Sequence, residues 1–594
     1  MNTQETAGTR PMTSMRQMLR DAWTIARPYW FSEDRWAGRG LLLAVIALNL
    51  AIVAINVLLN KWYNVFYNSL QDKNYDVFLQ QLFRFGILAG SFILVAVYEL
   101  YLNQMLQIRW RRWLTERYLN AWLEDRAYYR MQLVGGETDN PDQRIAEDVR
   151  LFIAGAGGGG GTLGLAIGGM RAVVTLVSFV TILWGLSGAF TLPWIGITVP
   201  AYMVWAALLY AIVGTWLTDR IGRPLVRLNF NQQRFEADFR FGLVRFRENT
   251  EGVALYRGEA DELRNFRDRF ANVVSNWWSI MRQRKRLTAF TASYAQAAVI
   301  FPFVVAAPRY FRGEIPLGGL VQTAQAFGQV QDSLSYIVSS YTELAEWRAV
   351  IERLSGFQRA IDRAHAEAAQ QGCRRSEDGQ ALGLEHVDLL LPGGRTLIQG
   401  VDLSFPRGES VIISGPTGSG KSTLFRAIAG IWPFGRGEIR MPSGGRTLFL
   451  PQKPYLPVGT LRAVVAYPAL PEGVDDAALR EALAAVGLPE YGSHLDEAHN
   501  WALRLSPGEQ QRIAFARALV QKPDWLFLDE ATSAMDEAGE ARLYALLRDR
   551  LPGTTLLSVG HRSSLRPFHS RQLVVQPNGP DAAASLVEVA AAAR

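Results

Sequence analysis

The stretch GPTGSGKST, residues 415–423, carries the residue types that bind phosphate groups. It matches the GxxxxGKS pattern, follows the apolar run SVIISG and opens a helical run, which is the context that a phosphate-binding loop requires. Its glycines let backbone amides curl around phosphates, Lys421 reaches the outer phosphates, and Ser422 offers a hydroxyl to magnesium. A chance glycine-rich turn is the weaker alternative. The predicted contacts are Gly415, Thr417, Gly418, Ser419, Gly420, Lys421, Ser422 and Thr423.

The stretch WLFLDE, residues 525–530, is an apolar strand that ends in two acids. Asp529 is placed to hold magnesium, directly or through water, and Glu530 to polarise an attacking water. Two acids after a strand are usually only a solvated strand end. Because this pair follows a phosphate loop in the same chain, hydrolysis of a bound nucleotide is the favoured interpretation.

A third stretch, LSPGEQQR at residues 505–512, precedes a helical run. Ser-Pro-Gly favours a loop, and EQQRIAFARAL then repeats apolar residues at helical spacing. The simple interpretation is a helix N-terminus. Free amides and the helix dipole at that end also bind anions. The stretch is therefore a second candidate for contact with a phosphate.

Length and composition indicate what must position these residues. A chain of 594 residues is too long for one ordinary core, so two or more domains are expected. Half of it is hydrophobic and 17 residues are Trp, yet the charged fraction is ordinary, which favours a membrane part joined to a soluble part. The net charge of +7 comes mainly from arginines between apolar runs, so a membrane is favoured over nucleic acid as the partner. Cys373 alone supports neither a disulfide framework nor a metal cluster.

Six apolar stretches are candidates for membrane spans of about 20 residues. The third and fourth are so close that they predict a tight hairpin, and the sixth is too polar to be assigned from hydropathy alone. Arginine-rich stretches at the N-terminus, after span two and after span four place both termini in the cytoplasm, in agreement with the absence of a cleavable signal peptide. The candidates are Leu41–Leu59, Phe85–Leu106, Ala172–Gly188, Pro193–Trp216, Leu287–Pro308 and Leu317–Val338.

The predicted fold is a multidomain membrane protein in which a six-span α-helical domain precedes an α/β phosphate-loop domain. Helical patterns between the spans predict that spans two to five continue beyond the bilayer. The glycine-rich stretch Gly155–Gly169 leads into span three and is a possible hinge. The predicted parts are an N-terminal segment 1–39, a transmembrane domain 40–357, a linker 358–381, a nucleotide-binding domain 382–575 and a low-complexity tail 576–594.

Residues 380–575 resemble the ATP-binding cassette family, because five motifs occur in the family's order and spacing. The resemblance implies ATP and Mg²⁺ as ligands and ATP hydrolysis as the activity. It makes LSPGE a signature loop, with Ser506, Gly508 and Glu509 at the nucleotide of a second subunit. A homodimer with two composite sites follows. The other implied residues are Gln452, which would sense magnesium and the membrane domain, Asp536 in the D-loop and the switch histidine His561.

Two positions depart from the family pattern. Pro507 replaces the commoner glycine of the signature loop and removes one amide donor. The aromatic residue that usually stacks on adenine is missing near Leu390 or Leu391.

Residues 20–358 resemble the SbmA/BacA peptide-uptake proteins and their cassette-fused relatives, distant kin of the peroxisomal fatty-acyl transporters. The resemblance is carried by stretches such as NVLLNKWYNVFYNSLQDKNYDVF and APRYFRGEIPLGGLVQTAQAFGQVQDSLSYIVSSYTELAEWRAVIERL. It implies the exporter-type fold in a bacterial inner membrane. It also implies import of hydrophilic solutes such as peptides or cobalamin-like compounds. Export of lipid or fatty-acyl substrates, and a sensor or gate that moves no cargo, are the alternatives.

Rows of polar residues inside the spans bear on the cargo. Each row shares one helix face, and polar groups that face lipid are costly. The rows therefore predict a hydrated cavity, with helix-to-helix hydrogen bonding as the alternative for any single row. Glu99 is a candidate proton-responsive site, or is simply paired. The rows are Gln322, Gln325, Gln329 and Asp332 on span six, Asn49, Asn56 and Asn60 on span one, and Glu99 with Asn103 on span two.

Overall fold

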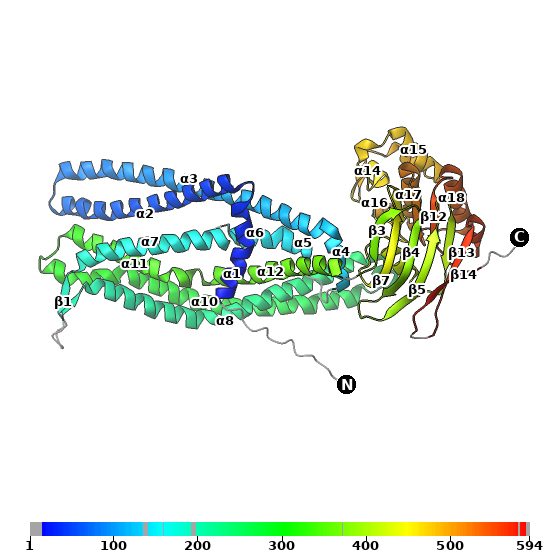
Figure 1. The fold of residues 1–594 in the computed structure, drawn as a ribbon. Helices are drawn as coiled ribbons and strands as arrows, with labels where there is room; N and C mark the ends of the chain where they lie inside the picture. Colours follow the sequence, from blue (N-terminus) through cyan, green and yellow to red (C-terminus); the bar gives the residue numbers. More distant parts are fainter. Residues whose placement is uncertain are drawn as a thin grey trace. The chain divides into compact units, whose positions relative to one another are not determined.

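The computed structural model describes residues 15–134, 140–158, 160–191, 198–370, 372–579 and 582–589. It divides into two compact units, which Figure 1 colours along the chain. The first, here called the membrane unit, contains Met1–Leu119 and Asn140–Phe357. The second, the nucleotide unit, contains Asn120–Asp139 and Gln358–Arg594.

The membrane unit contains six long helices at the positions of the six predicted spans. Within the described residues, five of them are long and apolar enough to cross a membrane. The sixth, α11, has 23 residues but a more polar sequence, which is why hydropathy alone does not assign it. The helices are α2 (Arg35–Gln71), α3 (Tyr75–Leu123), α7 (Gly161–Ser187), α8 (Tyr202–Glu248), α10 (Glu259–Phe311) and α11 (Leu317–Ser339).

Three of these helices are far longer than a bilayer requires. Helices α3, α8 and α10 have 49, 47 and 53 residues. At 1.5 Å per residue they extend roughly 70 to 80 Å, against about 30 Å for the hydrocarbon core. Helices α8 and α10 pack along each other, and the Asn276 side chain donates to Gln232 Oε1 at 2.9 Å between them. The predicted continuation beyond the bilayer is confirmed for spans two, four and five.

Span three differs from that prediction, because a glycine loop interrupts its helix. Helix α6 (Val149–Ala154) ends at Gly155, and α7 begins at Gly161. Both glycines have left-handed φ values, +70° and +64°. A Cβ on Gly155 would lie 2.7 Å from the Gly161 nitrogen, so the two backbones approach too closely for a side chain. Gly155 and Gly161 thus form a close approach between the ends of α6 and α7, and residues 161–169 belong to α7.

The connection between spans three and four also differs from the prediction. Strand β2 (Thr198–Pro200) pairs antiparallel with β1 (Ala189–Thr191), and residues 192–197 lie outside the described part. Helix α8 therefore begins at Tyr202 rather than at the predicted Pro193. Ala201, with φ +50°, turns the chain from strand to helix.

Shorter helices lie in the membrane unit and in residues 120–139 and 358–370 of the nucleotide unit. In Figure 1, α1 crosses the direction of the long helices. It buries Met18, Ala22 and Ile25, while Leu19 and Trp23 are exposed. These helices are α1 (Met15–Ala26), α4 (Ala127–Val134), α5 (Pro141–Gln143), α9 (Thr250–Tyr256) and α12 (Tyr341–Gln370), with the single turns η1 (Arg27–Phe31), η2 (Glu124–Arg126) and η3 (Arg144–Asp148).

The segment predicted as a linker, 358–381, is mostly regular structure. Helix α12 continues to Gln370, and β3 (Arg374–Gly379) pairs with β7 (Gly435–Pro442) in a four-stranded sheet. Leu354, Phe357 and Ile361 of α12 are buried, so tertiary packing stabilises a helix whose apolar pattern is weak in the sequence. The sheet has the order β3-β7-β4-β5, with β4 at Leu382–Leu390 and β5 at Thr396–Phe405.

A second sheet has six strands in the order β14-β13-β6-β12-β11-β8. Its parallel strands are apolar along most of their length, as expected where both faces are covered. The segment predicted as a low-complexity tail, 576–594, contains β14, which pairs antiparallel with β13. The nucleotide-binding domain therefore extends beyond the predicted boundary at residue 575. The strands are β6 (Ser410–Ser414), β8 (Thr447–Leu450), β11 (Trp525–Asp529), β12 (Thr555–Val559), β13 (Arg571–Gln576) and β14 (Ser585–Val589).

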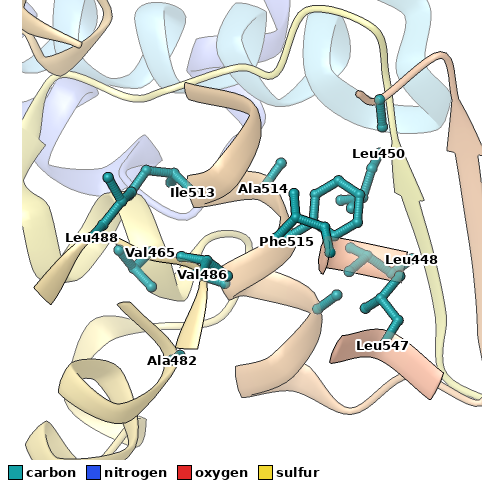
Figure 2. Close-up of a cluster of buried hydrophobic side chains, with 14 of the residues drawn as sticks. Leu448, Leu450, Val465, Ala482, Val486, Leu488, Ile513, Ala514, Phe515 and Leu547 are labelled. Atoms are coloured by element: carbon teal, nitrogen blue, oxygen red, sulfur yellow. The ribbon is translucent and has the colours of Figure 1, made fainter. Parts of the chain in front are cut away.

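Helices cover this sheet, and their core anchors the LSPGEQQR stretch. Figure 2 shows Ile513, Ala514 and Phe515 of α17 among Leu488, Val465 and neighbouring apolar side chains. These three residues are at most 1% exposed, so α17 is held rigidly. The helices are α13 (Lys421–Ile428), α14 (Leu461–Ala466), α15 (Asp476–Ala485), α16 (Trp501–Arg504), α17 (Pro507–Gln521) and α18 (Glu537–Arg550); β9 (Gly459–Thr460) and β10 (Ala498–His499) form a short pair. Single turns η4 (Pro471–Gly473), η5 (Pro489–Ser493) and η6 (Ser563–Phe568) connect them.

Candidate nucleotide site

The phosphate-binding loop connects β6 to α13, as its sequence predicts. Gly415, Gly418 and Gly420 have φ values of +142°, +81° and +100°. A Cβ on Gly415 would lie 2.7 Å from the Val575 carbonyl oxygen, so that position must be glycine. Thr417 and Gly418 are exposed at the tip of the loop, and Thr423 is buried on α13, beyond the tip.

Lys421 and Ser419 supply polar groups to the inside of this loop. Lys421 Nζ donates to the carbonyl oxygens of Gly415 at 2.9 Å and Pro416 at 2.7 Å. Burial lowers the pKa of Lys421, and the nearby Glu530 and Asp529 oppose that change. Among the described residues, the buried Oγ of Ser419 has no hydrogen-bond partner. A cation and an unpartnered hydroxyl in a ring of glycine amides fit a phosphate group.

Ser422 and Asp529 meet at the end of strand β11. Ser422 Oγ donates to Asp529 Oδ1 at 2.9 Å. Burial raises the pKa of Asp529, while the hydrogen bond from Ser422 lowers it. A hydroxyl and a carboxylate at this separation are the oxygen ligands that Mg²⁺ prefers, so the residues present fit the metal.

Two other predicted residues, Gln452 and His561, converge on the carboxylate of Glu530. Gln452 Nε2 donates to Glu530 Oε2 at 3.1 Å, and His561 Nε2 lies 3.0 Å from Glu530 Oε1. Glu530 has φ +50°, a conformation that is uncommon for a residue with a side chain. Its backbone N–H donates to the Val559 carbonyl oxygen at 3.1 Å, which holds that strained position. The arrangement can orient and deprotonate a water molecule at the end of β11.

The signature stretch forms a capped helix N-terminus. Ser506 caps α17, and its Oγ accepts from the Glu509 amide at 3.4 Å while Glu509 Oε2 accepts from the Ser506 amide at 2.7 Å. Burial acts to raise the pKa of Glu509, but the Ser506 hydrogen bonds together with Arg512 and Tyr491 lower its pKa overall. Pro507 occupies the first helical position, where its fixed φ suits the helix, and the Gly508 amide is still available.

Among the described residues, no hydrogen bond connects the signature stretch to the phosphate loop of the same chain. The described side-chain hydrogen bonds of Ser506 all go to Glu509. The D-loop residue Asp536 caps α18, and its Oδ1 accepts from the Gly539 amide at 3.0 Å. Ser506, Gly508 and Asp536 thus belong to helix termini rather than to the Lys421 site.

Gln511 is a site residue that sequence reasoning missed. It is 3% exposed, and its Nε2 donates to the Gln452 carbonyl at 3.0 Å and to Ser533 Oγ at 3.1 Å. Its Oε1 accepts from the Ala534 amide at 3.0 Å. One side chain therefore joins the signature helix, the glutamine loop and the D-loop. No local pattern marked Gln511, because its partners come from other loops.

The end of strand β4 has leucines where an adenine-stacking aromatic is expected, but an indole lies beside it. Trp432 Nε1 donates to the Leu390 carbonyl oxygen at 2.9 Å, and its ring packs edge-on to Phe434. Cys373, near the same strands, donates to the Arg436 carbonyl oxygen, and burial raises its pKa to about 11, so it is a structural thiol.

The polar rows of the membrane unit are partly paired with one another, which corrects the prediction that whole rows line a cavity. Gln322 is 8% exposed, and its Nε2 donates to Asn60 Oδ1 at 3.2 Å while its Oε1 accepts from Asn64 at 2.7 Å. Gln325 and Asp332 of the same row are exposed. The row thus changes from helix packing at its N-terminal end to open surface further along.

Glu99 is hydrogen-bonded to neighbouring side chains, which is the simpler alternative to a proton-responsive site. Its Oε1 accepts from Asn49 at 3.0 Å and from Asn103 at 3.4 Å. Gln107 extends the chain by donating to Asn103 Oδ1 at 3.2 Å and to the Gly158 carbonyl oxygen at 3.0 Å. A continuous set of hydrogen bonds therefore connects α2, α3 and the glycine loop.

The geometry defines a nucleotide hydrolase joined to a membrane domain. Comparison with known proteins identifies the family to which the chain belongs. Residues 25–311 match the ABC transporter transmembrane region 2 family, and residues 398–533 match the ABC transporter family. The chain is 38% identical to an uncharacterized ABC transporter ATP-binding protein of Haemophilus influenzae, over 90% of this chain and 89% of that protein. It therefore belongs to the ABC transporters.

Other relatives have more specific names. The inner membrane ABC transporter ATP-binding protein YddA of Escherichia coli is 34% identical over 93% of this chain and 97% of its own length. The human lysosomal cobalamin transporter ABCD4 is 28% identical over 95% of both chains. A solved bacterial Atm1-family ABC exporter with ATP bound has a TM-score of 0.69, at 19% identity, over 90% of this chain and 93% of that one. The predicted exporter-type fold is thus confirmed, as are ATP binding and ATP hydrolysis coupled to transport.

Proposed function

We propose that this ABC transporter is an ATP-driven importer of hydrophilic solutes such as peptides across a bacterial inner membrane. The name of the YddA relative supports the membrane, and the name of the ABCD4 relative, a cobalamin transporter, supports a large polar cargo. The sequence resemblance to the SbmA/BacA group supports peptide uptake, and the arginine-rich stretches between the spans support a cytoplasmic position for both termini.

The nucleotide unit supplies the driving reaction. In this proposal Lys421 and the loop amides bind the outer phosphates of ATP. Ser422 and Asp529 would hold Mg²⁺, which would supply positive charge to the phosphates. Glu530 orients the attacking water. Gln452 and His561 both contact the Glu530 carboxylate and hold it in position. In this proposal their contacts with it depend on whether the nucleotide is bound.

The chain acts as a homodimer in this proposal. Ser506, Gly508 and Glu509 lie at the capped N-terminus of α17, which suits them to bind a γ-phosphate. No described hydrogen bond joins Ser506 to the chain's own phosphate loop, so the nucleotide of a second copy is the natural ligand. Two chains then form two composite sites.

One observation carries the choice of cargo. Gln325 and Asp332 are exposed on α11, a helix that lies among apolar spans and packs on α2, α7, α8 and α10. Exposure of an amide and a carboxylic acid to hydrocarbon costs several kcal/mol, so this face requires water or a polar partner. A hydrated cavity satisfies both groups and accepts polar cargo. A lipid or fatty-acyl substrate would favour apolar walls.

Transport into right-side-out vesicles tests this proposal. Vesicles that contain the protein and internal ATP should accumulate a labelled hydrophilic peptide or cobalamin, and vesicles with Lys421→Ala protein should not. Inside-out vesicles that instead accumulate the label from an ATP-containing medium would show export. ATP-dependent movement of a labelled fatty acid alone would support the lipid alternative.

A further inference from the structure

Helix α18 carries a buried carboxylate that the sequence patterns did not single out. Glu540 is 2% exposed and lies one turn after the helix cap Asp536. A charge in such a place is costly unless hydrogen bonds and opposite charges compensate it. In the described part of the chain, its side-chain hydrogen bonds and its ion pair come from the two loops that follow Glu530 and His561.

The first loop follows strand β11. Thr532, two residues after Glu530, is 3% exposed, and its Oγ1 donates to Glu540 Oε2 at 2.6 Å. Hydrogen bonds to ionised oxygens at such a distance are strong and directional. The carboxylate of Glu540 thus restrains the backbone that leads out of the strained Glu530.

The second loop follows strand β12. Ser564, three residues after His561, donates from Oγ to Glu540 Oε1 at 2.9 Å. Arg562 Nη1 lies 3.7 Å from Glu540 Oε2 and donates to the Met535 carbonyl oxygen at 2.8 Å. The same guanidinium therefore joins the histidine loop to the D-loop and to the carboxylate.

We propose that Glu540 is a positioning residue that sets the separation of Glu530 and His561 by holding the loops after both. Its two oxygens accept from different loops, so a change in one loop moves the other. The 3.0 Å approach of the histidine ring to the Glu530 carboxylate depends on that shared anchor. This inference rests on the proposed roles of Glu530 and His561.

A conservative substitution tests it in the full-length protein. Glu540→Gln keeps the size of the side chain but removes the charge and leaves one oxygen to accept where there were two. Turnover per bound nucleotide should fall between about 10- and 100-fold, while ATP affinity and KM change less than about two-fold. Glu537→Gln removes an exposed carboxylate from the same helix and should leave turnover unchanged.

A double-mutant cycle separates positioning from folding. Thr532→Val and Ser564→Ala should each lower kcat, and each should have little further effect when Glu540 is already Gln, because the three act as one unit. Independent, multiplicative effects would overturn the proposal. So would a parallel loss of nucleotide-binding sites and turnover, which indicates misfolding, or an unchanged kcat in Glu540→Gln.

The roles on which the inference rests are tested apart from it. If Glu530→Gln is inactive and Glu540→Gln has wild-type kcat, only the positioning role fails. If Glu530→Gln retains turnover, the proposed role of Glu530 fails, whatever Glu540→Gln does.

Discussion

His561 Nε2 lies 3.0 Å from Glu530 Oε1, although 30 residues lie between them in the sequence. The two side chains come from the ends of β11 and β12, which are neighbouring parallel strands in register, with Asp529 opposite Val559. The pairing of those strands is what brings them together. Three predictions concern the nucleotide site and the polar face of α11, and a fourth concerns His569.

Glu530→Gln should abolish ATP turnover and leave ATP binding intact. The amide keeps the shape of the side chain but cannot accept a proton from water, and it removes no predicted phosphate contact. We expect kcat to fall at least about 100-fold with ATP affinity changed less than about three-fold. Measurement of ATPase rate and nucleotide binding on purified protein checks this, with Glu537→Gln as the exposed control. Wild-type turnover in Glu530→Gln would refute the role.

A mixed dimer tests whether the signature acts on the second subunit. A Lys421→Ala subunit combined with a Ser506→Arg subunit has one site with both defects and one intact site. It should retain some ATPase activity, while either variant homodimer is nearly inactive. If all three are equally inactive, crosslinking between Ser506 and the partner's phosphate loop decides whether both sites must act or the loop serves its own chain.

The α11 row should divide into two functional groups. Gln325→Leu with Gln329→Leu should lower uptake of a hydrophilic peptide and preserve basal ATPase activity, because it makes the exposed Gln325 and the half-buried Gln329 apolar in a different unit from the nucleotide site. Gln322→Leu should instead destabilise the protein by about 1 to 3 kcal/mol, since it removes the donor to the buried Asn60 Oδ1 and the side-chain acceptor of the half-buried Asn64. Transport assays and thermal unfolding distinguish them. Normal transport by the double variant, with cysteines there closed to water-soluble reagents, would remove the support for a cavity.

His569 should make stability depend on pH. Burial lowers its pKa from 6.5 to about 4, while its Nδ1 lies 2.8 Å from the Leu565 carbonyl oxygen. The unfolded chain therefore binds more protons below pH 6.5, so the stability that His569 contributes is complete above that pH and is lost as pH falls toward 4, by about 3 kcal/mol.

The measurement is thermal unfolding of the full chain between about pH 7 and pH 5. His569→Gln should reduce the decrease in midpoint over that range. His386→Gln, at a side chain that is 88% exposed, should reproduce the wild-type decrease. A wild-type decrease in His569→Gln would show that the buried imidazole is not the group responsible.

Much of the nucleotide site was predictable, because its motifs are local. A loop such as GPTGSGKST needs its glycines, lysine and serine within a few residues, so the pattern survives without any knowledge of the fold. Gln511 and Glu540 were not predictable in this way, since their partners at Gln452, Thr532 and Ser564 come from other loops. The linker at 358–381 was misassigned because long-range contacts, rather than local pattern, stabilise its elements: α12 buries Ile361 and Ala364, and β3 pairs with β7.

By itself the amino-acid sequence determined the spans, the order of the two domains and the phosphate chemistry, because hydrophobic length and short motifs are properties of contiguous residues. Only the tertiary structure decided which polar groups in the spans are used for packing. Asn60 on α2 and Gln322 on α11 form a hydrogen bond with each other. Helical periodicity predicts the face of each helix on which a residue lies, but not that these two faces meet. Whether an amide faces a neighbouring helix or open surface depends on how helices pack against each other, and that relation exists only in the folded chain.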